Sequence, residues 1–337
     1  LNQQNALSLK EQERIAAEKE AERKELEKSK TEAELAQSEA EGARTLSMLI
    51  GAGIALALVL ILVVVFIRNN KKLKEKNDQI AAQNEELDKK NKSITESINY
   101  ARKIQNALMA SNLTLSDTFD QHMLFNKPRD IVSGDFSWCD ANSQDCVIAV
   151  ADCTGHGVPG ALMSVLAISS LEKIVKHEGL RNPGKILQRM NDDLHSMFGN
   201  EATKASGVKD GMDVVIINVK SDRSKAVFAG SRNSLLKVTN GEIIEFKGNK
   251  THLGYNKGHE NFNSQEIPLK AGDSLYLYSD GFYDQKGGKE GKKFYPKKFR
   301  EMLASNATLS MKDQSNKYEE ILAGWSSGYE QIDDILI

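Results

Sequence analysis

The uncharged stretch at residues 46–67 constrains the fold of this chain more than any other segment. It reads LSMLIGAGIALALVLILVVVFI and lacks the polar face that a core helix of a water-soluble domain would keep. As an α-helix rising 1.5 Å per residue, it would extend about 33 Å, enough to cross a hydrocarbon core of about 30 Å. We therefore predict one transmembrane helix at residues 46–67.

Basic residues are concentrated after this stretch. The nearest preceding residues offer only Arg44, with Glu39 and Glu41 before it, whereas the residues that follow include Arg68, Lys71, Lys72, Lys74 and Lys76. The positive-inside rule then predicts that the C-terminal side faces the cytoplasm. We expect a single-pass protein of the inner (cytoplasmic) membrane, with the C-terminal part of the chain in the cytoplasm.

The segments on both sides of the predicted membrane helix have helical composition. Residues 1–45 are rich in Glu, Lys, Ala and Gln and contain no Pro. They predict a charged helix, which is either a solvated or weakly coiled helix or the end of a sensory region. Residues 71–110 carry heptads, with d positions at Leu73, Ile80, Leu87, Ile94 and Ala101 and a positions at Asn77, Asn84, Asn91, Ile98 and Gln105.

Such heptads are typical of a two-stranded coiled coil, and repeated Asn at a favours a parallel dimer with a defined register. We expect a parallel homodimer through residues 71–110, which would link the membrane to the rest of the chain. The alternative is a long single helix with a modest apolar stripe.

From residue 111 to residue 337 the composition becomes that of a globular domain. We predict strands at residues 122–126, 146–151, 214–219, 226–229 and 274–278, and helices at residues 159–177, 183–198, 296–303 and 311–326. Strands, a helix pair, further strands and further helices in this order indicate an α+β layered domain.

Charge and cysteine content exclude several classes of protein. The net charge is −2 and the isoelectric point lies near 6.4, so no strong basic field indicates a nucleic-acid partner. Cys139, Cys146 and Cys153 form no C-x-x-C pair, which argues against a zinc site or a disulfide framework. We expect reduced, half-buried thiols.

Four short acidic segments carry the functional information. Asp135 lies in SGDF, Asp152 in VADCTGHG, Asp280 in LYSDGFYD, and Asp333 with Asp334 in QIDDILI. Asp152 and Asp280 each end an apolar run and lie close to a Gly, as expected for carboxylates delivered at strand ends. Lone carboxylates gathered by folding bind hard divalent cations such as Mg²⁺ or Mn²⁺. An Asp beside a Gly can also be a simple turn residue, and spacing alone does not decide between these readings.

Taken together, these segments resemble a known family. KPRDIVSGDFSW, VADCTGHGVPGALMS, DGMD, LYLYSDGFYDQ and QIDDILI occur in the order and spacing of the SpoIIE-like branch of the metal-dependent type 2C (PPM) protein serine/threonine phosphatases. The resemblance covers residues 93–337. It implies an αββα sandwich, here preceded by a coiled-coil helix and one transmembrane helix, with the phosphatase domain at residues 111–337.

The resemblance also implies roles for individual residues. Asp152 would bridge two Mn²⁺ or Mg²⁺ ions, and the carbonyl of Cys153 would complete one of them. Asp280 and Asp333 would bind the first ion, and Asp135 the second, directly or through water. Asp213 of DGMD and Asp334 are candidates for outer-shell roles. His156 would be a general acid or, equally, a polar residue that starts a helix.

The implied activity is hydrolysis of phosphoserine or phosphothreonine on a bacterial regulatory phosphoprotein, such as an anti-sigma-factor antagonist, by metal-activated water. Residues 93–109 resemble helices that form part of a regulatory switch in this family. Where relatives more often read AGANNPL and DQFGG, this chain reads FAGSRNSLL and DQKGG, and Arg129 cannot be assigned as a phosphate-binding arginine. Rival interpretations are an inactive scaffold of the same fold and a nucleotide cyclase, although GGDEF is absent.

Overall fold

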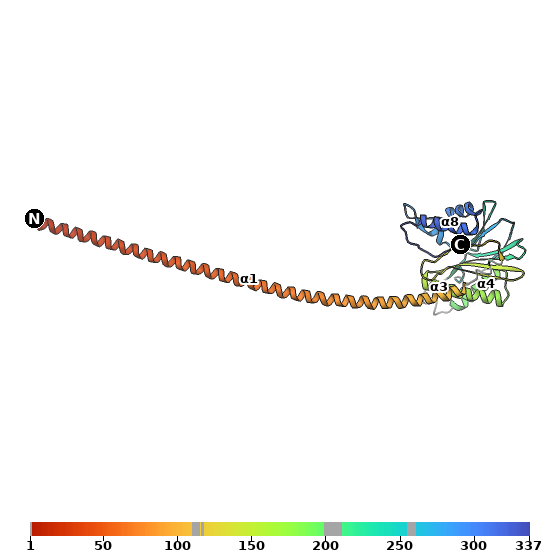
Figure 1. The fold of residues 1–337 in the computed structure, drawn as a ribbon, viewed down its shortest axis with the longest axis horizontal. Helices are drawn as coiled ribbons and strands as arrows, with labels where there is room; N and C mark the ends of the chain where they lie inside the picture. Colours follow the sequence, from red (N-terminus) through yellow and green to blue (C-terminus); the bar gives the residue numbers. More distant parts are fainter. Residues whose placement is uncertain (1, 110–114, 116–117, 199–210, 255–260) are drawn as a thin grey trace. The chain divides into compact units, whose positions relative to one another are not determined.

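The structure is a computed structural model that describes residues 2–109, 115, 118–198, 211–254 and 261–337. The chain divides into two compact units, Leu1–Lys90 and Asn91–Ile337. Helix α1 (Asn2–Leu108) contributes to both units (Figure 1).

In the first unit, α1 exposes every side chain that is described from residue 7 to residue 90. The apolar stretch 46–67 is included, with Phe66 67% exposed. By length and composition this stretch could cross a membrane. The segment Gly157–His177 meets the same criterion, but more than half of its apolar window is buried, as expected for the core helix of a globular domain.

The second unit contains a sheet with the strand order β2-β3-β4-β5-β8, in which all neighbours are antiparallel. Its strands are β2 (Phe136–Ala141), β3 (Asp145–Cys153), β4 (Met212–Lys220), β5 (Lys225–Ser231) and β8 (Gln265–Pro268). Successive side chains of a strand point to opposite faces. In β4, Val214 and Ile216 therefore join one apolar cluster, and Val215 and Ile217 join another on the opposite face.

A second sheet, with the order β7-β6-β9, packs against the first. Its strands are β6 (Ser234–Thr239), β7 (Glu242–Lys247) and β9 (Ser274–Tyr276). Phe228 of β5 and Leu235 of β6 belong to one buried cluster, which forms the layer between the sheets. Two short ladders lie outside these sheets: β1 (Asn126–Lys127) with β12 (Ile335–Leu336), and β10 (Lys286–Gly287) with β11 (Lys292–Lys293).

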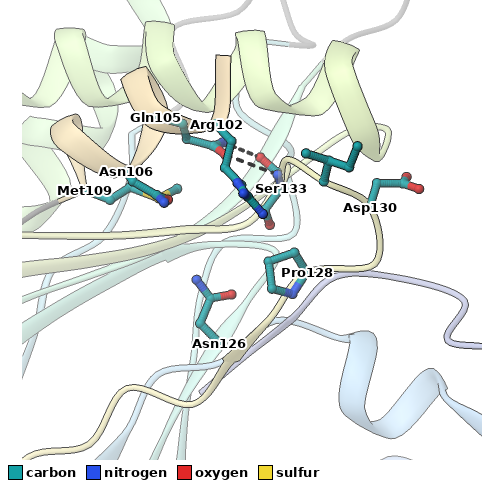
Figure 2. A pocket seen from close by; sticks show the side chains of 9 residues that line it. Arg102, Gln105, Asn106, Met109, Asn126, Pro128, Asp130 and Ser133 are labelled. Carbon is teal, nitrogen blue, oxygen red and sulfur yellow. Dashed lines mark hydrogen bonds between the residues drawn. The ribbon is translucent and has the colours of Figure 1, made fainter. Parts of the chain in front are cut away.

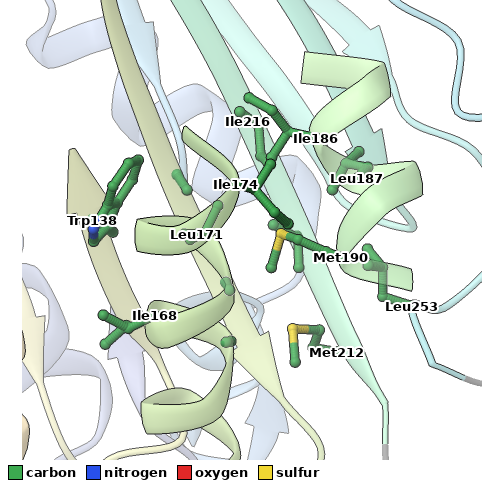
Figure 3. Close-up of a cluster of buried hydrophobic side chains, with 14 of the residues drawn as sticks. Trp138, Ile168, Leu171, Ile174, Ile186, Leu187, Met190, Met212, Ile216 and Leu253 are labelled. Carbon is green, nitrogen blue, oxygen red and sulfur yellow. The ribbon is translucent and has the colours of Figure 1, made fainter. Parts of the chain in front are cut away.

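Helices cover the outer face of the first sheet. They are α3 (Gly157–Leu171), its π-helical continuation η1 (Glu172–His177) and α4 (Pro183–Phe198). Figure 3 shows Ile174 and Met190 pointing from these helices toward Ile216 of β4. Burial of this apolar surface, at roughly 25 cal/mol per Å², is the main stabilising contribution to this half of the domain.

The second sheet is covered by α7 (Pro296–Asn306) and α8 (Met311–Trp325), with the short α6 (Gly281–Asp284) beside them. Leu236 of β6 and Tyr318 of α8 share one core cluster. In Figure 1, α3 and α4 lie on one side of the strands and α8 on the other. The layers therefore run helix, sheet, sheet, helix, which confirms the predicted αββα sandwich.

The structure also corrects local predictions. The strand expected at residues 122–126 is wrong: the strand found is Asn126–Lys127, and of the residues before it Phe125 exchanges backbone hydrogen bonds with Ile337, both at 2.9 Å, so pairing starts where the C-terminal segment runs alongside. The strand expected at 274–278 ends at Tyr276. Cys139, Cys146 and Cys153 form no disulfide with one another, and all three are buried rather than half-buried.

Candidate active site

The ladder between β3 and β4 brings two carboxylates together at one edge of the first sheet. β3 ends in Asp152 and Cys153, and its register places Asp152 opposite Asp213 and Cys153 opposite Met212. Residues directly opposite in an antiparallel pair have Cβ atoms about 4.5–5.5 Å apart. Asp152 and Asp213 are therefore neighbours at this edge because of strand pairing alone.

A close backbone approach brings the third and fourth acidic segments together. Asp280 directly precedes α6, and a Cβ atom on Gly281 would lie 1.9 Å from the carbonyl oxygen of Asp334. Only glycine permits this contact, because any side chain would collide with backbone. Ser279 strengthens the contact, since its N–H donates to the carbonyl of Leu336 at 2.9 Å. Asp280 is thereby held beside the Asp333–Asp334 turn.

Asp135 enters the site from the loop before β2. The carboxylate of Asp334 accepts hydrogen bonds from the backbone N–H groups of Gly134 and Arg129, both at 2.7 Å. A Cβ atom on Gly134 would also lie 2.8 Å from the carbonyl oxygen of Gly155. Asp334 therefore holds the Asp135 loop in place.

The acidic segments meet at a pocket of about 300 Å³. Its lining consists of Asp152, Cys153, Thr154, Gly155, His156, Asp213, His252, Asp280 and Asp333. Asp135 is buried, at 2% exposure, and is not among the lining residues. The structure thus gathers Asp152, Asp280 and Asp333 at one cavity and brings Asp213 and His252 to the same place.

Burial, together with repulsion between neighbouring carboxylates, raises the pKa values of this cluster. Burial, followed by the charges of Asp135, Asp280, Asp333 and Asp213, raises the pKa of Asp152 to about 10. Burial and Asp284, then Asp333, raise the pKa of Asp280 to about 6. Burial is also the main cause that raises the pKa values of Asp135, Asp213 and Asp333. Like charges gathered in a partly desolvated site destabilise their ionised forms.

This donor set fits hard divalent cations. The available ligands are carboxylate oxygens, which Mg²⁺ and Mn²⁺ prefer. Bound cations would also reduce the repulsion among these carboxylates. Within the described residues, Oδ2 of the buried Asp135 has no hydrogen-bond partner. In the same described residues, however, no three His, Cys, Asp or Glu side chains form a ready-made group around one ion.

His156 lies at the start of α3 and lines the same pocket. Its Nδ1 lies 2.9 Å from Oδ2 of Asp130, and its side chain makes no capping hydrogen bond to the helix. Both side chains are about half exposed. A carboxylate on one ring nitrogen fixes the orientation of an imidazole and thereby determines where its other nitrogen points.

Sequence reasoning missed His252 and Arg232. Nδ1 of His252 lies 2.5 Å from Oδ1 of Asp213, and its Nε2 accepts a hydrogen bond from Nη1 of Arg232. Nothing around THLG in the sequence marks His252. Arg232 lies in FAGSRNSLL. The difference between this segment and the sequence more common in the family was the one signal that could have indicated Arg232.

Residues 142–337 match the family described as Stage II sporulation protein E (SpoIIE). The chain belongs to the SpoIIE family. Its αββα domain is a PP2C-type protein serine/threonine phosphatase domain, as predicted. No curated protein matches the chain by sequence comparison.

Solved structures support the same assignment. This SpoIIE-family chain is 33% identical to the SiaA-PP2C domain of Pseudomonas aeruginosa, with a TM-score of 0.66 over 73% of this chain and 95% of that one. The PP2C phosphatase domain of SpoIIE from Bacillus subtilis, with a fragment of its regulatory domain, gives 18% identity and a TM-score of 0.51, covering 63% and 60%. The RsbU and RsbW domains of Rv1364c from Mycobacterium tuberculosis give 20% identity and 0.50, covering 63% and 57%.

Proposed function

We propose that this protein is a membrane-anchored phosphatase that hydrolyses phosphoserine or phosphothreonine on a bacterial regulatory phosphoprotein, such as an anti-sigma-factor antagonist, with two Mn²⁺ or Mg²⁺ ions. One observation carries the proposal: carboxylates from distant segments converge on one pocket, where burial and then mutual repulsion raise the pKa of Asp152. Such a cluster is unfavourable unless cations bind it, and two cations beside a water are a common basis for phosphate-ester hydrolysis.

Each acidic residue has a role in this proposal. Asp152, the carbonyl of Cys153, Asp280, Asp333 and Asp135 would hold the ions. The ions, when bound, supply charge neutralisation and a more acidic water. Asp334 would hold the Asp135 loop through its hydrogen bonds to Gly134 and Arg129.

His156 would donate a proton to the departing serine or threonine oxygen. Its contact with Asp130 supports this role, because a ring held by a carboxylate presents its second nitrogen in a fixed direction. The proton would move from the imidazole to the leaving oxygen as the phosphorus–oxygen bond breaks.

A contact between the end of α1 and the domain supports control by the linker helix. Gln105 is buried at 3% exposure, between exposed neighbours on α1. Its Nε2 donates to the carbonyl of Ser133 at 2.6 Å and to Oγ of Ser164 at 2.8 Å, and its Oε1 accepts from the N–H of Ser133 at 3.2 Å. Figure 2 shows Gln105 pointing at Ser133 beside a pocket of about 250 Å³.

Ser133 connects Gln105 to the site, because its Oγ accepts a hydrogen bond from the N–H of Asp135 at 3.1 Å. We therefore place the regulatory step at residues 71–110, where pairing of the heptads in a parallel homodimer would set the position of Gln105 and, through Ser133, that of Asp135. The transmembrane helix at 46–67 would anchor this dimer, with the phosphatase domain in the cytoplasm.

The test uses the whole chain in lipid nanodiscs. Release of phosphate from a phosphoserine peptide is measured with Mn²⁺, with Mg²⁺ and with EDTA, for the natural protein and for Asp152→Asn. Turnover that needs metal and is lost in Asp152→Asn is the expected result. If no metal supports turnover although calorimetry shows that Mn²⁺ binds, the inactive-scaffold interpretation replaces this one.

A further inference from the structure

The turn between β5 and β6 contains an arginine in an unusual backbone conformation. Arg232 has φ 54°, in the left-handed region that glycine and asparagine adopt more readily. The turn is anchored on both sides: the N–H of Arg232 donates to the carbonyl of Asn249 at 2.6 Å, and Nδ2 of Asn233 donates to the carbonyl of Tyr278. The two anchors fix the backbone from which the Arg232 side chain projects.

Arg232 is connected to the carboxylate pocket by a chain of side-chain contacts. Its Nη1 donates to Nε2 of His252. Because an arginine only donates, this nitrogen of His252 must be the acceptor, and the other ring nitrogen, Nδ1, lies 2.5 Å from Oδ1 of Asp213. The imidazole of His252 thus lies between a cation and a carboxylate that lines the pocket.

This arrangement leaves part of the guanidinium group exposed beside His252, which lines the pocket. Arg232 is exposed, and within the described residues no hydrogen bond from its Nε or Nη2 is seen. Its charge acts on Asp213, where it opposes the rise in the carboxyl pKa. Arg129 lies beside the site near Asp333, but its Nη1 already donates to the carbonyl of Ile332.

The phosphoryl group of a substrate that enters a pocket lined by carboxylates is repelled by them. Cationic groups of the protein near the phosphoryl oxygens would offset this repulsion. Guanidinium groups suit this task, because their planar donors match phosphoryl oxygens and keep their charge at all relevant pH values. We propose that Arg232, positioned by His252 and Asp213, binds the phosphoryl oxygens of the phosphoserine or phosphothreonine substrate. This inference rests on the proposed function and adds the residue that recognises the substrate's phosphoryl group.

The backbone conformation provides a variant that removes the cation without straining the fold. Arg232→Gly is compatible with φ 54°, so its melting temperature should not fall. The chain also contains a matched control: Arg223 has the same φ of 54° in the turn between β4 and β5, and its side chain binds Asp120 and the carbonyl of Thr118. Arg223→Gly therefore repeats the backbone change away from the pocket.

The experiment measures KM and kcat for a phosphoserine peptide with Mn²⁺, using the whole chain in nanodiscs. It also measures the Kd of the corresponding non-hydrolysable phosphonate peptide by fluorescence anisotropy. Loss of a charge-assisted hydrogen bond should raise KM and Kd about tenfold to hundredfold in Arg232→Gly, with kcat within about threefold of the natural protein. Arg223→Gly should change neither constant, and Mn²⁺ affinity by calorimetry should be the same in all three proteins.

Unchanged KM and Kd in Arg232→Gly would overturn the inference, as would an equal rise in both glycine variants. Failure of the proposed function looks different. In that case the natural protein releases no phosphate from the peptide with any metal, while anisotropy still reports whether Arg232 contributes to binding the phosphonate. Arg232→Lys, which keeps the charge but loses the planar donors, should give an intermediate Kd.

Discussion

Asp152 and Asp213 stand directly opposite each other on β3 and β4 at the edge of the pocket. Both carboxyl pKa values are raised, with burial as the main cause, and the charge of Asp213 contributes to the rise at Asp152. The fold therefore holds these carboxylates together at a cost to its stability, unless positive charge binds between them.

Replacing Asp152 with Asn should separate stability from activity. Asn keeps the shape of the side chain and cannot ionise, so the folded variant no longer has to keep a buried carboxyl protonated at neutral pH. We expect the metal-free variant to gain at least about 1 kcal/mol, or about 2–4 °C in Tm, while metal-dependent hydrolysis is lost. Differential scanning fluorimetry with EDTA measures the gain. Asp222→Asn, at an exposed turn, should bring no such gain.

The metal-free protein should become less stable as pH rises from 5 to 9. The pKa of Asp152 is raised to about 10 and that of Asp280 to about 6, both above the value of about 3.9 for an unfolded Asp. The folded state then binds more protons than the unfolded state across this range, so stability is lost as pH increases through these pKa values. Tm measured across the range checks the sign, and Mn²⁺ should flatten the curve.

Gly281 should not tolerate even a methyl group. The added Cβ would lie 1.9 Å from the carbonyl oxygen of Asp334, and backbone has little room to yield. We expect Gly281→Ala to cost about 1–3 kcal/mol and to lower kcat by moving Asp280 relative to Asp333. Gly324, inside α8, has no atom within 4 Å of a built Cβ, so Gly324→Ala should instead stabilise by about 0.5–1 kcal/mol. Urea unfolding compares the two variants.

Gln105→Leu should weaken the link between α1 and the Asp135 loop. The substitution leaves the N–H and carbonyl of the buried Ser133 without their partner, which costs about 1–3 kcal/mol. We expect Mn²⁺ to bind about tenfold more weakly, as measured by calorimetry on the whole chain. Lys103→Leu, on an exposed face of the same helix, serves as control. Identical Mn²⁺ affinities in the two variants would contradict control through Gln105.

Local signals in the sequence predicted some elements closely. Helix α4 begins at Pro183 and ends at Phe198, as expected, because proline favours a first helical turn and the apolar spacing is regular. Strands β6 and β7 were missed, since their alternation is weak and their stability comes from pairing with each other and with β9.

The candidate site was predictable only in part. Asp152 and Asp280 could be chosen because each follows an apolar run, yet their proximity depends on contacts that no local pattern encodes, such as that of Gly281 with Asp334. His252 reaches the pocket from a segment without any motif. Long-range register, rather than composition, decides which polar residues meet there.

Gln105 occupies an a position of the heptads, and in a paired coiled coil that position faces the partner helix. In this structure the same side chain is turned into its own domain, where it binds Ser133 and Ser164. If the heptads pair as proposed, Gln105 can either face the partner helix in the final heptad or dock on its own domain. The two arrangements exclude each other. Activity would then depend on the free-energy difference between the paired and the docked state of this helical turn. A change of about 1.4 kcal/mol in that difference, transmitted from the membrane helix, would change the ratio of the two populations about tenfold.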